Sequence, residues 1–271
     1  MTSHAPPAEK RLKINAWPIV ALLAAVAAAV LLPTQALRMA DLVGYAVCHR
    51  IPDRSFFVQG IQLPLCARDT GMFSAALLGL LSFAVIRPER VALFPRRPHL
   101  YALAAFAAAW ALDGFNSYML LARGEPLLYM PQNWLRLVTG AFMGAAVSSF
   151  VVPLFNSAVW RPDLSASRPS VASWREVALL AGVALAVIAV VLWRPDFLYG
   201  PIALVSVLGV LLLLTVVNAL LVLLLMKKES RIQRWTEMAL PLMAGLMFTF
   251  TEIMAIALLR AWLTQELGLP F

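Results

Sequence analysis

Long apolar runs alternate along the chain with short clusters of charged residues and prolines. These runs approach or exceed the roughly 20 residues that an α-helix needs to cross a hydrocarbon core of about 30 Å. They cover about residues 16–32, 64–86, 99–121, 132–155, 175–193, 200–226 and 238–260. The pattern predicts an all-α fold, a polytopic membrane helix bundle with about seven transmembrane helices.

The first apolar run follows the basic stretch KRLK, an arrangement that secretory signals also show. No small-residue cleavage site follows it, and Pro33 and Arg38 come soon afterwards, so we expect a retained helix. A change of composition near residues 157–173 suggests two membrane regions. The first, residues 1–160, would hold four helices and a cysteine-containing outer loop, and the second, residues 161–271, would hold three helices.

Composition supports the membrane assignment and limits the partners. Apolar residues make up 62% of the chain and charged residues 13%, whereas soluble domains have roughly 25% charged residues. The net charge of +8 needs no nucleic acid, because basic loops that face anionic lipid explain it. We therefore expect membrane lipids as partners, together with other membrane subunits if the chain is part of a complex.

The distribution of basic residues predicts the orientation. If the N-terminus is cytoplasmic, most of the 22 Lys and Arg residues fall in the inner loops, as the positive-inside rule requires. These inner-loop residues are Lys10, Arg11, Lys13, Arg87, Arg90, Arg96, Arg97, Arg161, Arg168, Arg175, Lys227, Lys228, Arg231 and Arg234. The C-terminus and residues 33–63 would then face outward.

One outward segment, CHRIPDRSFFVQGIQLPLCARDTG (48–71), contains both cysteines of the chain and one of its three histidines. At about 1.5 Å per helical residue, polar residues of four predicted spans reach the same outer layer. They are Asp69, Asp113, Asn116, Asn133, Arg136 and Glu252. A charge inside a membrane is costly without a partner, so we expect an ion pair between Asp113 and Arg136. Gly140 and Gly144 would allow close helix packing.

Two further arginines and one amide have simpler interpretations. Arg68 and Arg260 lie near span ends, where their side chains are expected to extend toward the interface. Asn218 lies in a predicted span and is expected to form an interhelical hydrogen bond.

The segment and the two spans after it resemble an uncharacterised family of predicted prokaryotic membrane proteins. The shared signature reads C-H-x-x-P-x-R-S-F, then a run like QLPL, then C-A-R-C-T-G, with D-G and N-x-x-R-x-x-T-G in the next two spans. The chain has these motifs at Cys48–Phe56, Cys66–Gly71, Asp113–Gly114 and Asn133–Gly140. It departs at Asp69, where the family has a cysteine. The resemblance covers about residues 45–145 and implies a multi-pass protein of a prokaryotic plasma membrane, with no established activity.

The residue types of the segment allow several kinds of chemistry. Cys48, His49, Cys66 and Asp69 could form a metal site, since two thiolates, an imidazole and a carboxylate suit zinc or iron. A structural Cys48–Cys66 disulfide, or thiol–disulfide chemistry in which the two sulfurs toggle, would use the same cysteines.

Two other interpretations stay open. Arg50, Arg54, Arg68 and Arg136 could bind an anionic lipid head group, and the chain could instead be an accessory subunit without chemistry of its own. Under the metal hypothesis, neighbouring polar residues would orient the ligands or bind an anion: Arg50, Arg54, Arg68, Asp113, Asn116, Asn133, Arg136 and Glu252. The sequence assigns no catalytic residue and leaves open whether the protein is an enzyme.

Overall fold

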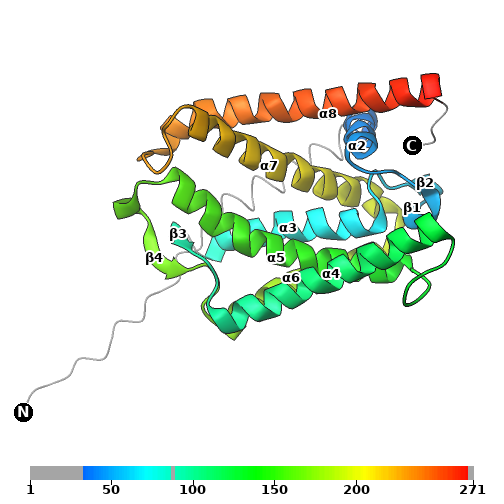
Figure 1. The fold of residues 1–271 in the computed structure, drawn as a ribbon, viewed down its shortest axis with the longest axis horizontal. Coiled ribbons are helices and arrows are strands. Elements are labelled where there is room, and N and C mark those ends of the chain that lie inside the picture. The colour runs from blue at the N-terminus through cyan, green and yellow to red at the C-terminus, as the bar shows by residue number, and fades with distance from the viewer. Residues whose placement is uncertain (1–32, 87–88, 268–271) are drawn as a thin grey trace, which may run out of the picture.

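The computed structural model describes residues 33–86 and 89–267. These ranges form a bundle of seven α-helices with short strands at both ends (Figure 1). The helices are α2 (Pro33–Val47), α3 (Ala67–Ile86), α4 (Arg97–Arg123), α5 (Asn133–Val159), α6 (Trp174–Trp193), α7 (Tyr199–Leu225) and α8 (Ala239–Leu267). The strands are β1 (Phe57–Val58), β2 (Ile61–Gln62), β3 (Val91–Leu93) and β4 (Ala166–Pro169).

Six predicted spans coincide with helices α3 to α8. The first predicted span, residues 16–32, lies outside the described residues. Four segments are long and apolar enough to cross a membrane: Asn133–Val159, Trp174–Trp193, Asp196–Leu225 and Trp235–Glu266. The described residues therefore indicate a membrane helix bundle but do not reach the predicted number of seven spans. The first turn of α3 contains the charged residues Arg68 and Asp69, and Asp113 and Asn116 interrupt the apolar sequence of α4, which is a continuous helix.

Helix α2 lies in a stretch for which the sequence predicts an outer loop instead of a helix. Its apolar residues Ala40, Val43 and Ala46 are buried at helical spacing and pack with residues of α7 and α8. In Figure 1, α2 is seen nearly end-on while the long helices run across the picture. The helix is only 15 residues long and includes the polar residues Thr34, Gln35, Arg38 and Asp41, so sequence hydropathy does not reveal it.

Helix α3 is the centre of the bundle and contacts α5, α6 and α7, while α4 packs on α5 and α8 on α7 (Figure 1). The α3–α5 contact depends on glycine, as predicted. A Cβ atom on Gly140 would clash with the backbone carbonyl of Arg68, and one on Gly144 with that of Met72. Close packing of these two helices holds the first turn of α3 against the first turns of α5.

The three basic linkers that follow α3, α5 and α7 meet at one end of the bundle. Strand β3 pairs in parallel with β4, and Trp160 forms an isolated bridge with Ile232. The guanidinium of Arg90 stacks on the Trp160 ring at 3.6 Å. The cysteine segment lies at the opposite end, where β1 and β2 form a hairpin (Figure 1).

The cysteine segment packs down on the bundle, as predicted. Phe56 and Val58 are buried, and the hairpin turns at Gln59 and Gly60, which both have positive φ angles. Two such residues in succession are typical of the two-residue turns that join antiparallel strands. The hairpin fixes the path of the chain from Cys48 to Cys66.

Candidate functional site

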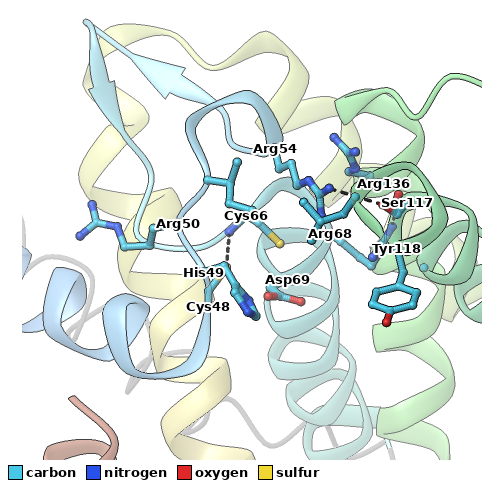
Figure 2. A pocket seen from close by; sticks show the side chains of 13 residues that line it. Cys48, His49, Arg50, Arg54, Cys66, Arg68, Asp69, Ser117, Tyr118 and Arg136 are labelled. Atoms are coloured by element: carbon cyan, nitrogen blue, oxygen red, sulfur yellow. Dashed lines mark hydrogen bonds between the residues drawn. The ribbon is translucent and has the colours of Figure 1, made fainter. Parts of the chain in front are cut away.

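A pocket of about 380 Å³ opens at the cysteine end of the bundle (Figure 2). Its walls come from the segment after α2, the start of α3, the second half of α4 and the start of α5. The polar or reactive residues that line it are Cys48, His49, Arg50, Arg54, Cys66, Arg68, Asp69, Ser117, Tyr118 and Arg136. The pocket thus combines two thiol groups with several guanidinium groups.

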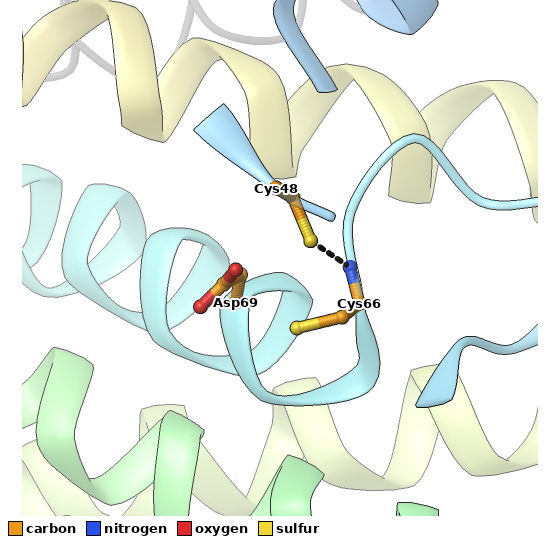
Figure 3. Close-up of side chains that lie close together, drawn as sticks. All are labelled: Cys48, Cys66 and Asp69. Atoms are coloured by element: carbon orange, nitrogen blue, oxygen red, sulfur yellow. Dashed lines mark hydrogen bonds between the residues drawn. The ribbon is translucent and has the colours of Figure 1, made fainter. Parts of the chain in front are cut away.

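Cys48, Cys66 and Asp69 form the thiol–carboxylate cluster of the pocket (Figure 3). Their ligand atoms all lie within 4.8 Å of one another, and both cysteines are free thiols. The backbone amide of Cys66 donates a hydrogen bond to the sulfur of Cys48 at 3.2 Å. The predicted proximity of Cys48 and Cys66 is therefore confirmed.

Gly44 makes this proximity possible. A Cβ atom at this position of α2 would clash with the backbone carbonyl of Pro64, two residues before Cys66. The glycine lets the end of α2 approach the start of α3, and Cys48 follows directly after α2. A close backbone approach of this kind is a recognised reason for glycine in a helix.

The local hydrogen bonds favour the thiolate form of Cys48. A hydrogen bond from the Cys66 side chain lowers the pKa of the Cys48 thiol and outweighs the opposing effects of burial and of Asp69. A thiolate is both the nucleophilic form of cysteine and the form that binds metals. Cys48 is therefore the more activated sulfur of the pair.

Two predicted site residues take other positions. His49 lines the pocket but is exposed and does not belong to the three-residue cluster. Arg50 pairs with Asp41 of α2 at 3.0 Å and points away from the other labelled arginines (Figure 2). The φ angle of Arg50 is 49°, a left-handed conformation that turns the chain between His49 and Ile51.

Asp113 pairs with Arg68 rather than with Arg136, so the predicted Asp113–Arg136 ion pair is wrong. Nε and Nη2 of Arg68 donate to Oδ2 of Asp113 at 3.1 and 2.5 Å. The prediction that the Arg68 side chain extends to the interface is also wrong, because this pair points into the bundle. Arg68 lies in the first turn of α3, where its backbone packs against Gly140 of α5. This close packing of the two helices brings Arg68 nearer to α4 than its predicted depth in the membrane suggests.

Asp113 and Asn116 also anchor the loop between α4 and α5. The Tyr129 hydroxyl donates to Oδ1 of Asp113 at 2.7 Å. Asn116 accepts from the Leu128 amide and donates to the Tyr129 carbonyl, both at 2.8 Å. Burial and the hydrogen bond to Asp113 raise the pKa of Tyr129 to about 12. Sequence reasoning missed Tyr129, because a single tyrosine in a linker gives no signal of a buried carboxylate partner.

Arg54 and Arg136 lie on one side of the pocket (Figure 2), and Asn133 contacts both Arg136 and the cysteine segment. The Asn133 amide donates to the carbonyls of Asp53 and Ser55 at 3.1 and 3.3 Å, and its Oδ1 accepts from Arg136 at 2.8 Å. Arg54 donates to the Ser117 carbonyl at 3.4 Å. Asn133 thus fastens the cysteine segment to the start of α5 and positions Arg136 beside it.

Glu252 does not line the pocket, although its predicted depth along the last span is similar to that of the other polar residues. Its carboxylate accepts a hydrogen bond from Asn218 at 2.9 Å, and Asn218 also donates to Thr249 at 3.1 Å. The predicted interhelical role of Asn218 is confirmed, between α7 and α8. Arg260 donates to the carbonyl oxygens of Tyr45 and Cys48, so its expected extension toward the interface is wrong.

Comparisons with known proteins agree with the resemblance seen in the sequence. Residues 48–150 match a family described as "Predicted membrane protein (DUF2085)". An uncharacterized protein of Methanocaldococcus jannaschii is 28% identical over 115 residues, which are 42% of this chain and 67% of the relative. No solved structure matches the chain. The archaeal relative and the apolar helices together indicate a prokaryotic membrane protein. Residues 48–150, which carry the thiol–carboxylate cluster, the arginines of the pocket and Asp113, are thus similar to an uncharacterised family of predicted membrane proteins.

Proposed function

We propose that the protein is a multi-pass protein of the prokaryotic plasma membrane whose thiol–carboxylate cluster binds a metal ion at the outer face. The observation that carries the metal proposal is the approach of Cys48, Cys66 and Asp69 to within 4.8 Å of one another. Two sulfurs bound to one tetrahedral zinc at about 2.3 Å lie about 3.8 Å apart. Small side-chain movements are enough to reach that spacing.

The donor set favours zinc, with iron as the second choice. Thiolates select zinc and iron over magnesium and calcium, and a carboxylate can replace a third thiolate as an anionic ligand. Three protein ligands leave the fourth position of a tetrahedron for a small molecule or for His49, which follows Cys48 and lines the same pocket. The positive charge of a bound metal would offset the negative charges of the cluster.

The orientation proposal rests on the two ends of the bundle. The basic linkers after α3, α5 and α7 meet at one end, and the pocket lies at the other (Figure 1). The positive-inside rule places the basic end in the cytoplasm. With residues 16–32 as a first span and α3 to α8 as six more, the N-terminus is inside and the pocket faces outward.

Metal analysis of the purified protein tests the cluster. The full chain is purified without chelator and without a histidine tag, and its zinc and iron content is measured by mass spectrometry. We expect about one metal ion per chain, lost in Cys48→Ser, Cys66→Ser and Asp69→Asn. Asp53→Asn is the matched control, because Asp53 is exposed and outside the cluster. A metal-free wild type, or variants that keep the metal, would contradict the proposal.

A Cys48–Cys66 disulfide is the second candidate, favoured by the free, adjacent thiols and the lowered pKa of Cys48. Alkylation under non-reducing conditions distinguishes the two. A metal site releases two alkylatable thiols when a chelator is added, whereas a disulfide releases them only with a reductant.

Labelling from one side of the membrane tests the orientation. Single cysteines are introduced by Glu125→Cys, in the linker after α4, and by Lys228→Cys, in the linker after α7, in a background without Cys48 and Cys66. Both positions are exposed. An impermeant maleimide added to intact cells should label position 125 and leave position 228 unlabelled, and the reverse result would overturn the orientation.

A further inference from the structure

Arg136 carries a buried charge that forms no ion pair with any carboxylate of the described residues. Its side chain lies in the wall of the pocket, and the residue is only 5% exposed. Nη1 donates to the Asn133 amide oxygen, a neutral group. The guanidiniums of Arg54 and Arg68 repel it, and the carboxylate of Asp113, which is paired with Arg68, attracts it without forming an ion pair. Burial of a charge without a counter-charge is costly, so this position needs a further stabilising partner.

Two of the other three arginines of the pocket have ion-pair partners. Arg50 pairs with Asp41, and Arg68 pairs with Asp113. Arg54, like Arg136, forms no ion pair within the part of the chain that the structure describes, and it donates only to a backbone carbonyl. Two guanidinium groups without an ion-pair partner among the described residues thus face one pocket from different elements. Helices α3 and α5 also begin at this end, and the positive ends of their dipoles strengthen the local attraction for an anion.

We propose that the pocket binds a phosphate group between Arg54 and Arg136. A single guanidinium can satisfy a carboxylate through two parallel hydrogen bonds. Phosphate offers more acceptor oxygens and can accept from two guanidiniums that converge from different elements. The volume of about 380 Å³ falls within the range of pockets that hold small ligands.

The rim of the pocket indicates that the phosphate is attached to an apolar chain. Tyr118 and Leu121 of α4 line the pocket and are 57% and 61% exposed. Leu112 and Phe115 continue this exposed apolar face along α4. A lipid could place its phosphate at the arginines and its acyl chain along α4. Free phosphate shares the same chemistry, so the experiment has to distinguish the two sources. The inference uses other residues than the metal proposal and does not depend on it.

Ligand-dependent stabilisation tests the site on the full chain in a phosphate-free maltoside detergent. The probes are inorganic phosphate, phosphatidic acid and diacylglycerol, which is the same lipid without the phosphate. The concentration dependence of the melting temperature gives the apparent affinity. We expect phosphatidic acid to stabilise the wild type and diacylglycerol to have no effect. Stabilisation by inorganic phosphate with equal affinity would identify free phosphate as the ligand.

Arginine variants locate the bound phosphate. Arg136→Gln and Arg54→Gln should each weaken phosphate-dependent stabilisation by about tenfold or more, as expected for the loss of a charged hydrogen bond. Arg50→Gln is the matched control, because Arg50 lines the same pocket but is paired with Asp41. Arg136→Lys keeps the charge and should retain part of the affinity, which separates a binding defect from a folding defect. The proposal is overturned if neither phosphate probe stabilises the wild type, or if Arg136→Gln responds like Arg50→Gln.

Discussion

Arg260 in α8 donates a hydrogen bond to the carbonyl oxygen of Cys48, 2.8 Å away. It also donates to the carbonyl of Tyr45, and its guanidinium lies 4.6 Å from the centre of the Tyr45 ring. The last carbonyls of a helix have no partner within the helix. Arg260 supplies that partner for α2 and holds Cys48 in place from the far end of the chain.

We predict that Arg260→Ala increases the reactivity of Cys48 toward a hydrophilic maleimide. Without Arg260 the end of α2 loses two carbonyl contacts, and Cys48, now 4% exposed, becomes accessible. Peptide-resolved mass spectrometry of the labelling rate in detergent measures the change. Arg123→Ala, at the exposed end of α4, is the control. Equal rates in both variants would show that Arg260 does not position Cys48.

We predict that Asp113→Asn destabilises the protein by about 3–5 kcal/mol, because it leaves the Arg68 charge inside the bundle without its partner. Arg136→Gln should change the free energy of unfolding by less than about 1 kcal/mol in the absence of an anion, since it removes a charge that has no ion-pair partner among the described residues. Reversible unfolding in mixed detergent micelles provides the measurement. The opposite ranking of the two variants would restore Arg136 as the partner of Asp113.

We predict that Cys66→Ala raises the pKa of Cys48. In the wild type the hydrogen bond from the Cys66 side chain lowers that pKa, and without it burial and Asp69 act unopposed. The rate of Cys48 alkylation as a function of pH should therefore shift to higher pH in metal-free protein. Cys66→Ser keeps a hydroxyl donor and should shift less. A pH profile that is the same in all three proteins would argue against the hydrogen bond.

We predict that Gly44→Ala destabilises the protein and slows oxidative cross-linking of Cys48 to Cys66. The added Cβ meets the Pro64 carbonyl, and overpacking of this kind costs about 1–3 kcal/mol. Gly182→Ala in α6 is the control, because no atom lies within 4 Å of its added Cβ. This control should be neutral or stabilising by up to about 1 kcal/mol. Equal stability of the two variants would mean that α2 packs less closely than described.

We predict that Tyr129 ionises at about pH 12. Its pKa is raised above the ordinary value of 10.0 by burial and by the hydrogen bond to Asp113. A raised pKa in the folded state contributes stability that is present below pH 10 and is lost as the pH rises toward 12. The difference in phenolate absorbance between wild type and Tyr129→Phe measures the titration. A midpoint at pH 10 would show that Tyr129 is solvated and does not hold the loop.

Hydropathy and loop charge were sufficient to predict α3 to α8, because each helix is a long apolar run bounded by prolines or basic residues. They were insufficient for α2, whose burial depends on contacts with α7 and α8 rather than on its own composition. The parallel pairing of β3 with β4 also depends on linkers that meet only after the helices have assembled. No local sequence signal encodes such long-range contacts.

The site was predicted only in part, because packing between helices decides which of its side chains meet. Residue types identified Cys48, Cys66 and Asp69, and helical spacing brought Asp113, Asn133 and Arg136 to the same end. Spacing along one helix does not tell which of two arginines reaches Asp113, because that choice depends on how closely α3 approaches α5 at Gly140. Depth likewise could not show that Glu252 faces Asn218 instead of the pocket.

The two ends of the bundle are fastened by different means. At the basic end, backbone hydrogen bonds join linkers that are far apart in sequence, from Arg96 to Val171, from Arg161 to Ile232 and from Ser230 to Ala158. At the pocket end, side chains form the hydrogen bonds between segments that are far apart in sequence. The donors among the described residues include Arg54, Arg68, Asn133 and Arg260. We expect the helices to stay together at the basic end and to separate first at the pocket end. A ligand in the pocket would then determine how far the bundle opens.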